Sequence, residues 1–168
     1  MAGLGEYVSW FDRYRRSFVV ASAAEQRNLD LKADHTCRVQ ENMGVLVEEL
    51  GIAEPMARLA RLIALFHDVG RFPQYCRYKT FKDSESENHG ALGARVLVEE
   101  GVLSKLSERE RSLVIRGVTL HNVFALPAGL DGESLLLLQL IRDADKLDIW
   151  RVFIEYYTAP PEERADAV

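Results

Sequence analysis

The four histidines of this 168-residue chain are the side chains best suited to chemistry, because each continues a stripe of apolar residues at helical spacing. They are His35, His67, His89 and His121. Two aspartates share this placement: Asp68 directly follows His67, and Asp143 interrupts an apolar stripe between Leu140 and Leu147. A polar side chain on a buried stripe must be paired, because burial without a partner costs free energy.

A single inward histidine is usually a core residue bonded to a backbone carbonyl, and a lone His-Asp dipeptide is weak evidence for a site. Four histidines and two aspartates on five predicted helices are harder to explain in this way. Neutral imidazoles and carboxylates together form a ligand set for Mn, Fe, Co, Ni or Zn rather than for Mg or Ca. The sequence therefore predicts a centre that holds a divalent transition metal.

Helices must position these residues, because apolar residues recur at helical spacing almost throughout and no alternating strand is found. We expect an all-α, single-domain helical bundle over residues 1–168, with a central metal site. Its segments are expected to be an N-terminal helix at about 4–20, a core at about 30–157 and a tail at 158–168.

Within the core, five helices and one long loop are expected. The helices are predicted at about 29–50, 54–70, 88–101, 107–122 and 133–157, and the loop at 71–86, where the periodicity is lost. Gly51 is expected to end the first of these helices, and Ser107 with Glu110 forms a predicted capping box. The aromatic residues of the last helix are expected to pack in the core. They are Trp150, Phe153, Tyr156 and Tyr157.

The order of these residues resembles the HD-domain metal-dependent phosphohydrolases, whose pattern is an early His, a His-Asp pair and a late Asp. The matching residues are His35, then His67-Asp68 in Phe66-His-Asp-Val-Gly-Arg71, then Asp143 in Arg142-Asp-Ala-Asp-Lys-Leu-Asp148. The resemblance covers about residues 34–150. It implies that these four residues hold one metal. His89 and His121 are placed like the extra histidines of two-metal members, which implies a second metal with Asp68 as the bridge.

The resemblance also implies a hydrolase that acts on phosphate ester bonds, either monoesters or diesters, in a nucleotide or a small phosphorylated metabolite. A metal-activated hydroxide would attack the phosphorus atom, with Asp68 as a catalytic residue. Arg71 stands where related enzymes often place a Lys or Arg, so it is expected to contact phosphate and to assist catalysis; a surface ion pair is the alternative. Lys79 and Lys146 are further candidates for substrate binding. Asp145 and Asp148, near Asp143, are expected to include a residue that orients a ligand.

Two other interpretations stay open. The di-iron oxygenases of the same fold use a similar ligand set, and composition does not separate them from hydrolases. A non-catalytic protein that binds a metal or a nucleotide as a regulator is the other alternative.

The composition narrows the partners. The 21 Lys and Arg against 26 Asp and Glu give a formal charge of -5, which argues against general nucleic-acid binding. Cys37 and Cys76 are isolated, so we expect reduced thiols and a cytoplasmic protein. No export signal and no membrane span is expected. The oligomeric state is left open.

Overall fold

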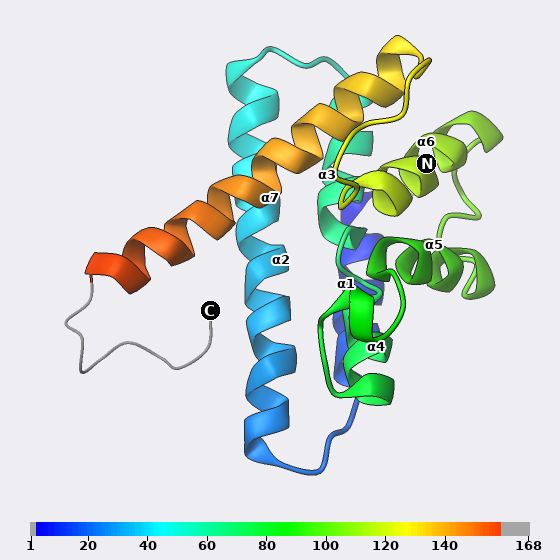
Figure 1. Cartoon of the computed structure of the whole chain (residues 1–168). Helices are drawn as coiled ribbons and strands as arrows, with labels where there is room; N and C mark the ends of the chain where they lie inside the picture. The colour runs from blue at the N-terminus through cyan, green and yellow to red at the C-terminus, as the bar shows by residue number, and fades with distance from the viewer. Residues whose placement is uncertain (1–2, 159–168) are drawn as a thin grey trace.

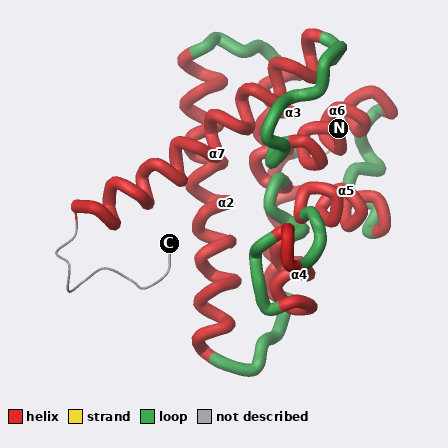
Figure 2. The backbone as a smooth tube through the Cα atoms, in the orientation of Figure 1, coloured by secondary structure: helices red, strands yellow, loops and turns green. Residues whose placement is uncertain are grey.

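The computed structural model describes residues 3–158, and within them it contains helices, turns and no strand. The helices are α1 (Leu4–Arg16), α2 (Ala23–Glu49), α3 (Met56–Phe66), α4 (Arg71–Tyr78), α5 (His89–Glu99), α6 (Glu108–Leu120) and α7 (Gly132–Thr158), with a short 3-10 helix, η1, at Asp83–Glu85. In Figure 2 helices make up most of the backbone, and loops and turns join them. The all-α prediction is confirmed. The predicted tail lies outside the described residues, except for Thr158.

Helix α3 lies at the centre of the bundle and packs against α1, α2, α6 and α7 (Figure 1). Its sequence is apolar nearly all round, and Leu62, Ile63 and Phe66 are fully buried. A helix of this kind has neighbours on every side. The chain that leaves its C-terminus, residues 67–70, therefore enters the middle of the protein, and this turn carries His67 and Asp68.

Two glycines allow the segments around this turn to approach closely. A Cβ atom at Gly70 would lie 2.2 Å from the backbone oxygen of His89, and one at Gly90 would lie 2.8 Å from the backbone oxygen of Thr119. Only glycine fits at such distances. These contacts hold the turn after α3, the start of α5 and the end of α6 side by side.

Several predicted helix ends are confirmed. The capping box of Ser107 and Glu110 is present at the start of α6, and Gly51 has the positive φ of 60° expected of a residue that follows a helix. Helix α2 begins earlier than predicted, because Ser22 caps it through a hydrogen bond from the backbone N–H of Glu25.

The predicted long loop at 71–86 is wrong, because residues 71–78 form α4 and residues 83–85 form η1. Helix α4 is only eight residues long, too short for its period to be visible in the sequence. Pro73 lies in its first turn, where the missing N–H costs no hydrogen bond. The helix buries Phe72, Gln74 and Tyr75 and brings Arg71 to the central turn.

The prediction that the aromatic residues of the last helix pack in the core is also wrong. Helix α7 crosses α2, and its C-terminal end extends beyond it (Figure 1). Trp150, Phe153 and Tyr157 are consequently 60%, 41% and 66% exposed. The side chain of Tyr156 lies outside the described part of the structure. None of the described helices combines the length and the apolar character needed to cross a membrane.

Candidate metal centre

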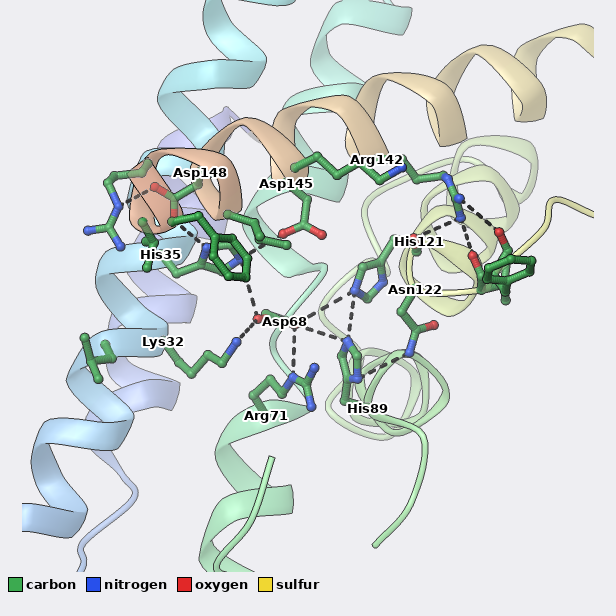
Figure 3. A pocket seen from close by; sticks show the side chains of 18 residues that line it. Lys32, His35, Asp68, Arg71, His89, His121, Asn122, Arg142, Asp145 and Asp148 are labelled. Atoms are coloured by element: carbon green, nitrogen blue, oxygen red, sulfur yellow. Dashed lines mark hydrogen bonds and ion pairs between the residues drawn. The ribbon is translucent and has the colours of Figure 1, made fainter. Parts of the chain in front are cut away.

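Two groups of three side chains lie next to each other at the centre of the bundle, and Figure 3 labels all of them except His67. One group is His35, His67 and Asp145, and the other is Asp68, His89 and His121. Within each group the candidate ligand atoms all lie within 4.8 Å of one another. The six side chains come from α2, the turn after α3, α5, the turn after α6 and α7. Segments distant in sequence thus converge on one site.

Backbone carbonyls fix the orientation of two of the imidazoles. The Nδ1 atom of His67 lies 2.8 Å from the carbonyl oxygen of Ala64, and that of His121 lies 2.8 Å from the carbonyl oxygen of Val118. A carbonyl oxygen can only accept a hydrogen bond, so each Nδ1 must carry the proton. Each Nε2 atom is then left with a lone pair that points into the site.

Carboxylates orient the other two imidazoles. Asp148 lies 2.7 Å from Nδ1 of His35, and Asp83 lies 2.8 Å from Nδ1 of His89. Burial by itself would raise the pKa of Asp148, but Arg38, His35 and Arg151 lower it to about 2. Asp148 is thus ionised and accepts a hydrogen bond from Nδ1–H of His35, as the charged cluster near Asp143 led us to expect.

Three of the histidines have lowered pKa values, which favour the neutral imidazole and leave the Nε2 atom available as a ligand. Burial lowers the pKa of His89 and of His121 to about 4, and burial also lowers the pKa of His67. Burial alone would lower the pKa of His35 too, but the carboxylates of Asp145, Asp68 and Asp148 outweigh this effect and raise the pKa of His35. A neutral imidazole is the form that binds a metal.

The Nε2 atoms approach one another in pairs. His35 and His67 bring theirs to 3.3 Å, and His89 and His121 bring theirs to 3.0 Å. When all four histidines are neutral and protonated at Nδ1, two lone pairs face each other across each gap, and a cation bound between them would offset their repulsion. The donor set therefore fits divalent transition metals, for which imidazole and carboxylate are suitable ligands.

Asp68 lies between the two groups. Its Oδ2 atom is 3.8 Å from Nε2 of His35 and 3.9 Å from Nε2 of His67, while its Oδ1 atom is 3.3 Å from Nε2 of His89. Burial alone would raise the pKa of Asp68, but Lys32 and nearby histidines hold it well below its ordinary value. An ionised carboxylate with one oxygen toward each group is suited to bridge two ions.

The structure corrects the predicted position of the late aspartate. Asp143 is exposed, whereas Asp145 places its Oδ1 atom 3.0 Å from Nε2 of His35 and 4.0 Å from Nε2 of His67. The two positions differ by about 200° around a helix. Leucines lie on all sides of the first half of α7, so the apolar pattern gave the wrong phase: Leu147, on the predicted inward stripe, is 42% exposed.

Two cations flank Asp68 (Figure 3). Nζ of Lys32 lies 3.1 Å from Oδ2 of Asp68, and Nε of Arg71 lies 3.4 Å from Oδ1. Arg71 also pairs with Asp83 at 3.1 Å and donates a hydrogen bond to the backbone oxygen of Phe81. The structure thus brings the predicted Arg71 to the site, and it adds Lys32, which was not predicted from the sequence although it lies one helical turn before His35.

The other predicted substrate-binding lysines differ in their placement. Lys146 is exposed and lines the cavity over the histidines. Lys79 does not line that cavity; its Nζ atom lies on the surface, 3.0 Å from Oε1 of Glu25. The prediction for Lys79 is therefore corrected.

A cavity of about 690 Å³ opens above the two groups. Its floor is formed by the carboxylates and imidazoles, and cationic side chains surround them. These cations are Lys32, Arg38, Arg71, Arg142 and Lys146. Their excess over the acidic groups beneath them suits an anionic ligand.

The HD domain family model matches residues 33–150, which is most of the chain. No curated protein and no solved structure gives a significant match. The predicted resemblance is confirmed, and members of this family are mostly metal-dependent hydrolases that bind divalent metals. On this match, and with a buried histidine-aspartate centre that could hold a metal, the chain belongs to the HD domain family.

Proposed function

We propose that this protein hydrolyses phosphate esters of small molecules, with one or two divalent transition metals held by the two histidine-aspartate groups. The observation that carries the proposal is the position of Asp68. Each of its carboxylate oxygens lies near the Nε2 atoms of one histidine group and beside one cation, which is Lys32 at Oδ2 and Arg71 at Oδ1. A site for metal ions and a pair of cations thus share one cavity.

The side chains divide the work of such a reaction between them. Divalent ions held by the two histidine-aspartate groups would supply a hydroxide at neutral pH and would stabilise negative charge on the phosphoryl group. Lys32 and Arg71 are placed to bind phosphoryl oxygens and to neutralise the charge that grows on them in the transition state. Asp148 and Asp83 keep His35 and His89 in the orientation that the ligand role requires.

An oxygenase of the same fold would need a similar ligand set. The two cations beside Asp68 favour the hydrolase, because a phosphoryl group carries the negative charge that they would neutralise. The test must therefore follow both phosphate release and oxygen consumption.

The experiment is a hydrolysis screen of the protein loaded in turn with Mn, Fe, Co, Ni and Zn, against nucleotides and small phosphate esters. Asp68→Asn is expected to lower kcat/KM by about 1000-fold or more, because it removes the shared carboxylate. Asp34→Asn, at an exposed position of α2, is the matched control and should retain activity. Full activity of Asp68→Asn, or oxygen uptake without phosphate release, would contradict the proposal.

A second pair of variants tests the role of the cations. Lys32→Gln should lower kcat/KM by about 10- to 100-fold, because it removes one charge beside the phosphoryl group. Lys79→Gln removes a lysine that pairs with Glu25 outside the cavity, so its kcat/KM should match that of the unaltered protein. Equal effects of the two variants would show that Lys32 acts only through the overall charge.

A further inference from the structure

The outer part of the cavity is lined by apolar side chains from three segments: α2, the loop after α6, and the C-terminal half of α7. The residues are Leu31, Val123, Phe124, Ile149, Val152 and Phe153, and we call them the apolar wall. Leu31 is 61% exposed and Phe124 is fully exposed. Apolar side chains that gather in this way beside a polar site are typical of a ligand-binding surface.

Phe124 is exposed, but the backbone beneath it is held in place. Arg142 of α7 donates hydrogen bonds to the backbone oxygens of His121 at 3.5 Å and Phe124 at 3.3 Å, and also to that of Val123 (Figure 3). A charged donor bound to successive carbonyls fixes the path of a loop. The hydrogen bonds from Arg142 thus hold the loop after α6 against α7, and this loop presents the Phe124 ring at the opening of the cavity.

The acidic groups of the cavity lie at its inner end, whereas the cation Lys146 is exposed. The acidic residues that line it are Asp68, Asp145 and Asp148, all within or next to the metal centre. Among the described lining residues, Asn122 is the one uncharged amide, and its Nδ2 already donates to Asp83 at 3.0 Å. The apolar wall thus offers surface area for contact but few groups that could read the edge of a nucleobase by hydrogen bonds.

We propose that the substrate is a phosphate ester whose alcohol part is a flat, apolar group, such as an aryl ring system, bound against the apolar wall. This inference rests on the proposed function, because the phosphoryl end is placed at the metal centre. The cationic inner end binds the phosphoryl group, and the wall binds the rest of the molecule by apolar contact and by stacking on Phe124. Selectivity then depends on the area of the alcohol part rather than on its hydrogen-bonding pattern.

The test measures binding without catalysis. The metal-loaded protein is titrated by calorimetry with methylphosphonate and with 1-naphthylmethylphosphonate, whose phosphorus–carbon bonds are not hydrolysed. The naphthyl compound should bind at least about 10-fold more tightly, because it alone reaches the wall. Phe124→Ala and Leu31→Ala should each reduce this preference by about 2- to 10-fold. Leu50→Ala is the matched control, since Leu50 is 60% exposed and does not line the cavity.

The outcomes separate the two proposals. Equal affinity for the two phosphonates, or a preference that survives both Phe124→Ala and Leu31→Ala, would overturn the role of the wall. A naphthyl preference that depends on the wall, in a protein that cleaves no phosphate ester, would support the wall and refute the hydrolase. Failure of both phosphonates to bind would refute both.

Discussion

Asp145 and Asp143 form a matched pair of positions for testing the metal centre, because they lie two residues apart on the same helix and differ in orientation. Asp145 contacts His35 and His67, whereas Asp143 is exposed. Replacing each in turn by Asn keeps the size of the side chain and removes its charge. The two variants have the same composition, so any difference between them reports the position alone.

The expected magnitude follows from these contacts. Loss of a hydrogen-bonding partner behind a ligand typically weakens metal binding by about 10- to 100-fold. Asp145 places its own oxygen among the ligand atoms, so Asp145→Asn should cost at least about 100-fold, or about 2.8 kcal/mol. Asp143→Asn removes an exposed charge that solvent and salt screen, so its effect should stay within about 2-fold.

The assay is a competition titration of each variant with Zn²⁺ or Mn²⁺ against a chelator of known affinity, with elemental analysis of the bound metal. Melting curves with and without chelator provide a second measurement, because a bound ion stabilises the folded state. This stabilisation grows with the logarithm of the free ion concentration divided by its Kd. If Asp143→Asn lost metal as severely as Asp145→Asn, or if Asp145→Asn bound metal normally, the assignment of Asp145 would be refuted.

Three further predictions concern the metal centre and the helices that form the bundle around it. Asp83→Asn should weaken metal binding by about 10- to 100-fold in the same titration, because it weakens the acceptor that orients His89; unchanged affinity would contradict this role. Gly90→Ala should lower the free energy of unfolding, measured by urea titration, by roughly 1–3 kcal/mol, because the new Cβ atom would meet backbone oxygens of α6. Gly44→Ala is the control: Gly44 has open space around it, so this variant should raise the free energy of unfolding by up to about 1 kcal/mol. Hydrogen bonds from Ser107 lower the pKa of Glu110 in the folded protein, so the ionised carboxylate stabilises the first turn of α6. This stabilisation is fully present above the pKa of Glu110 in the unfolded chain, and it is lost as the pH falls through the pKa of Glu110 in the folded protein. Glu110→Gln should thus cost about 0.3–1 kcal/mol at pH 7 and progressively less as the pH is lowered below the unfolded-state pKa, as followed by melting curves.

The parts of the fold that the sequence predicted well are those with a strong local signal. Helix α3 is apolar all round, and α6 begins with a capping box, so both could be placed from residue types alone. The four histidines were identified because each is polar at an otherwise apolar position. Their convergence in the structure is consistent with this interpretation.

The parts that the sequence did not predict depend on tertiary contacts. Helix α4 is short and is stabilised by burying one face, so its period was invisible. The phase of α7 depends on which of its many leucines meet α2 and α3, and that error exchanged Asp145 for Asp143. Lys32 looked like an ordinary exposed lysine, because its partner, Asp68, is distant in the sequence.

Two regions of the protein differ in how well they tolerate substitution: the close-packed glycines beneath the metal centre do not tolerate it, and the apolar wall at the surface does. At Gly70 a Cβ would lie 2.2 Å from a backbone atom, so no side chain, however small, fits there without moving two ligand-bearing segments apart. Leu31 and Phe124 face open space, and their side chains can be exchanged without disturbing the bundle. On the proposed role of the apolar wall, point mutations there would change substrate preference while the centre beneath keeps its geometry. Attempts to redirect this scaffold toward new substrates should vary the apolar wall and leave the glycines intact.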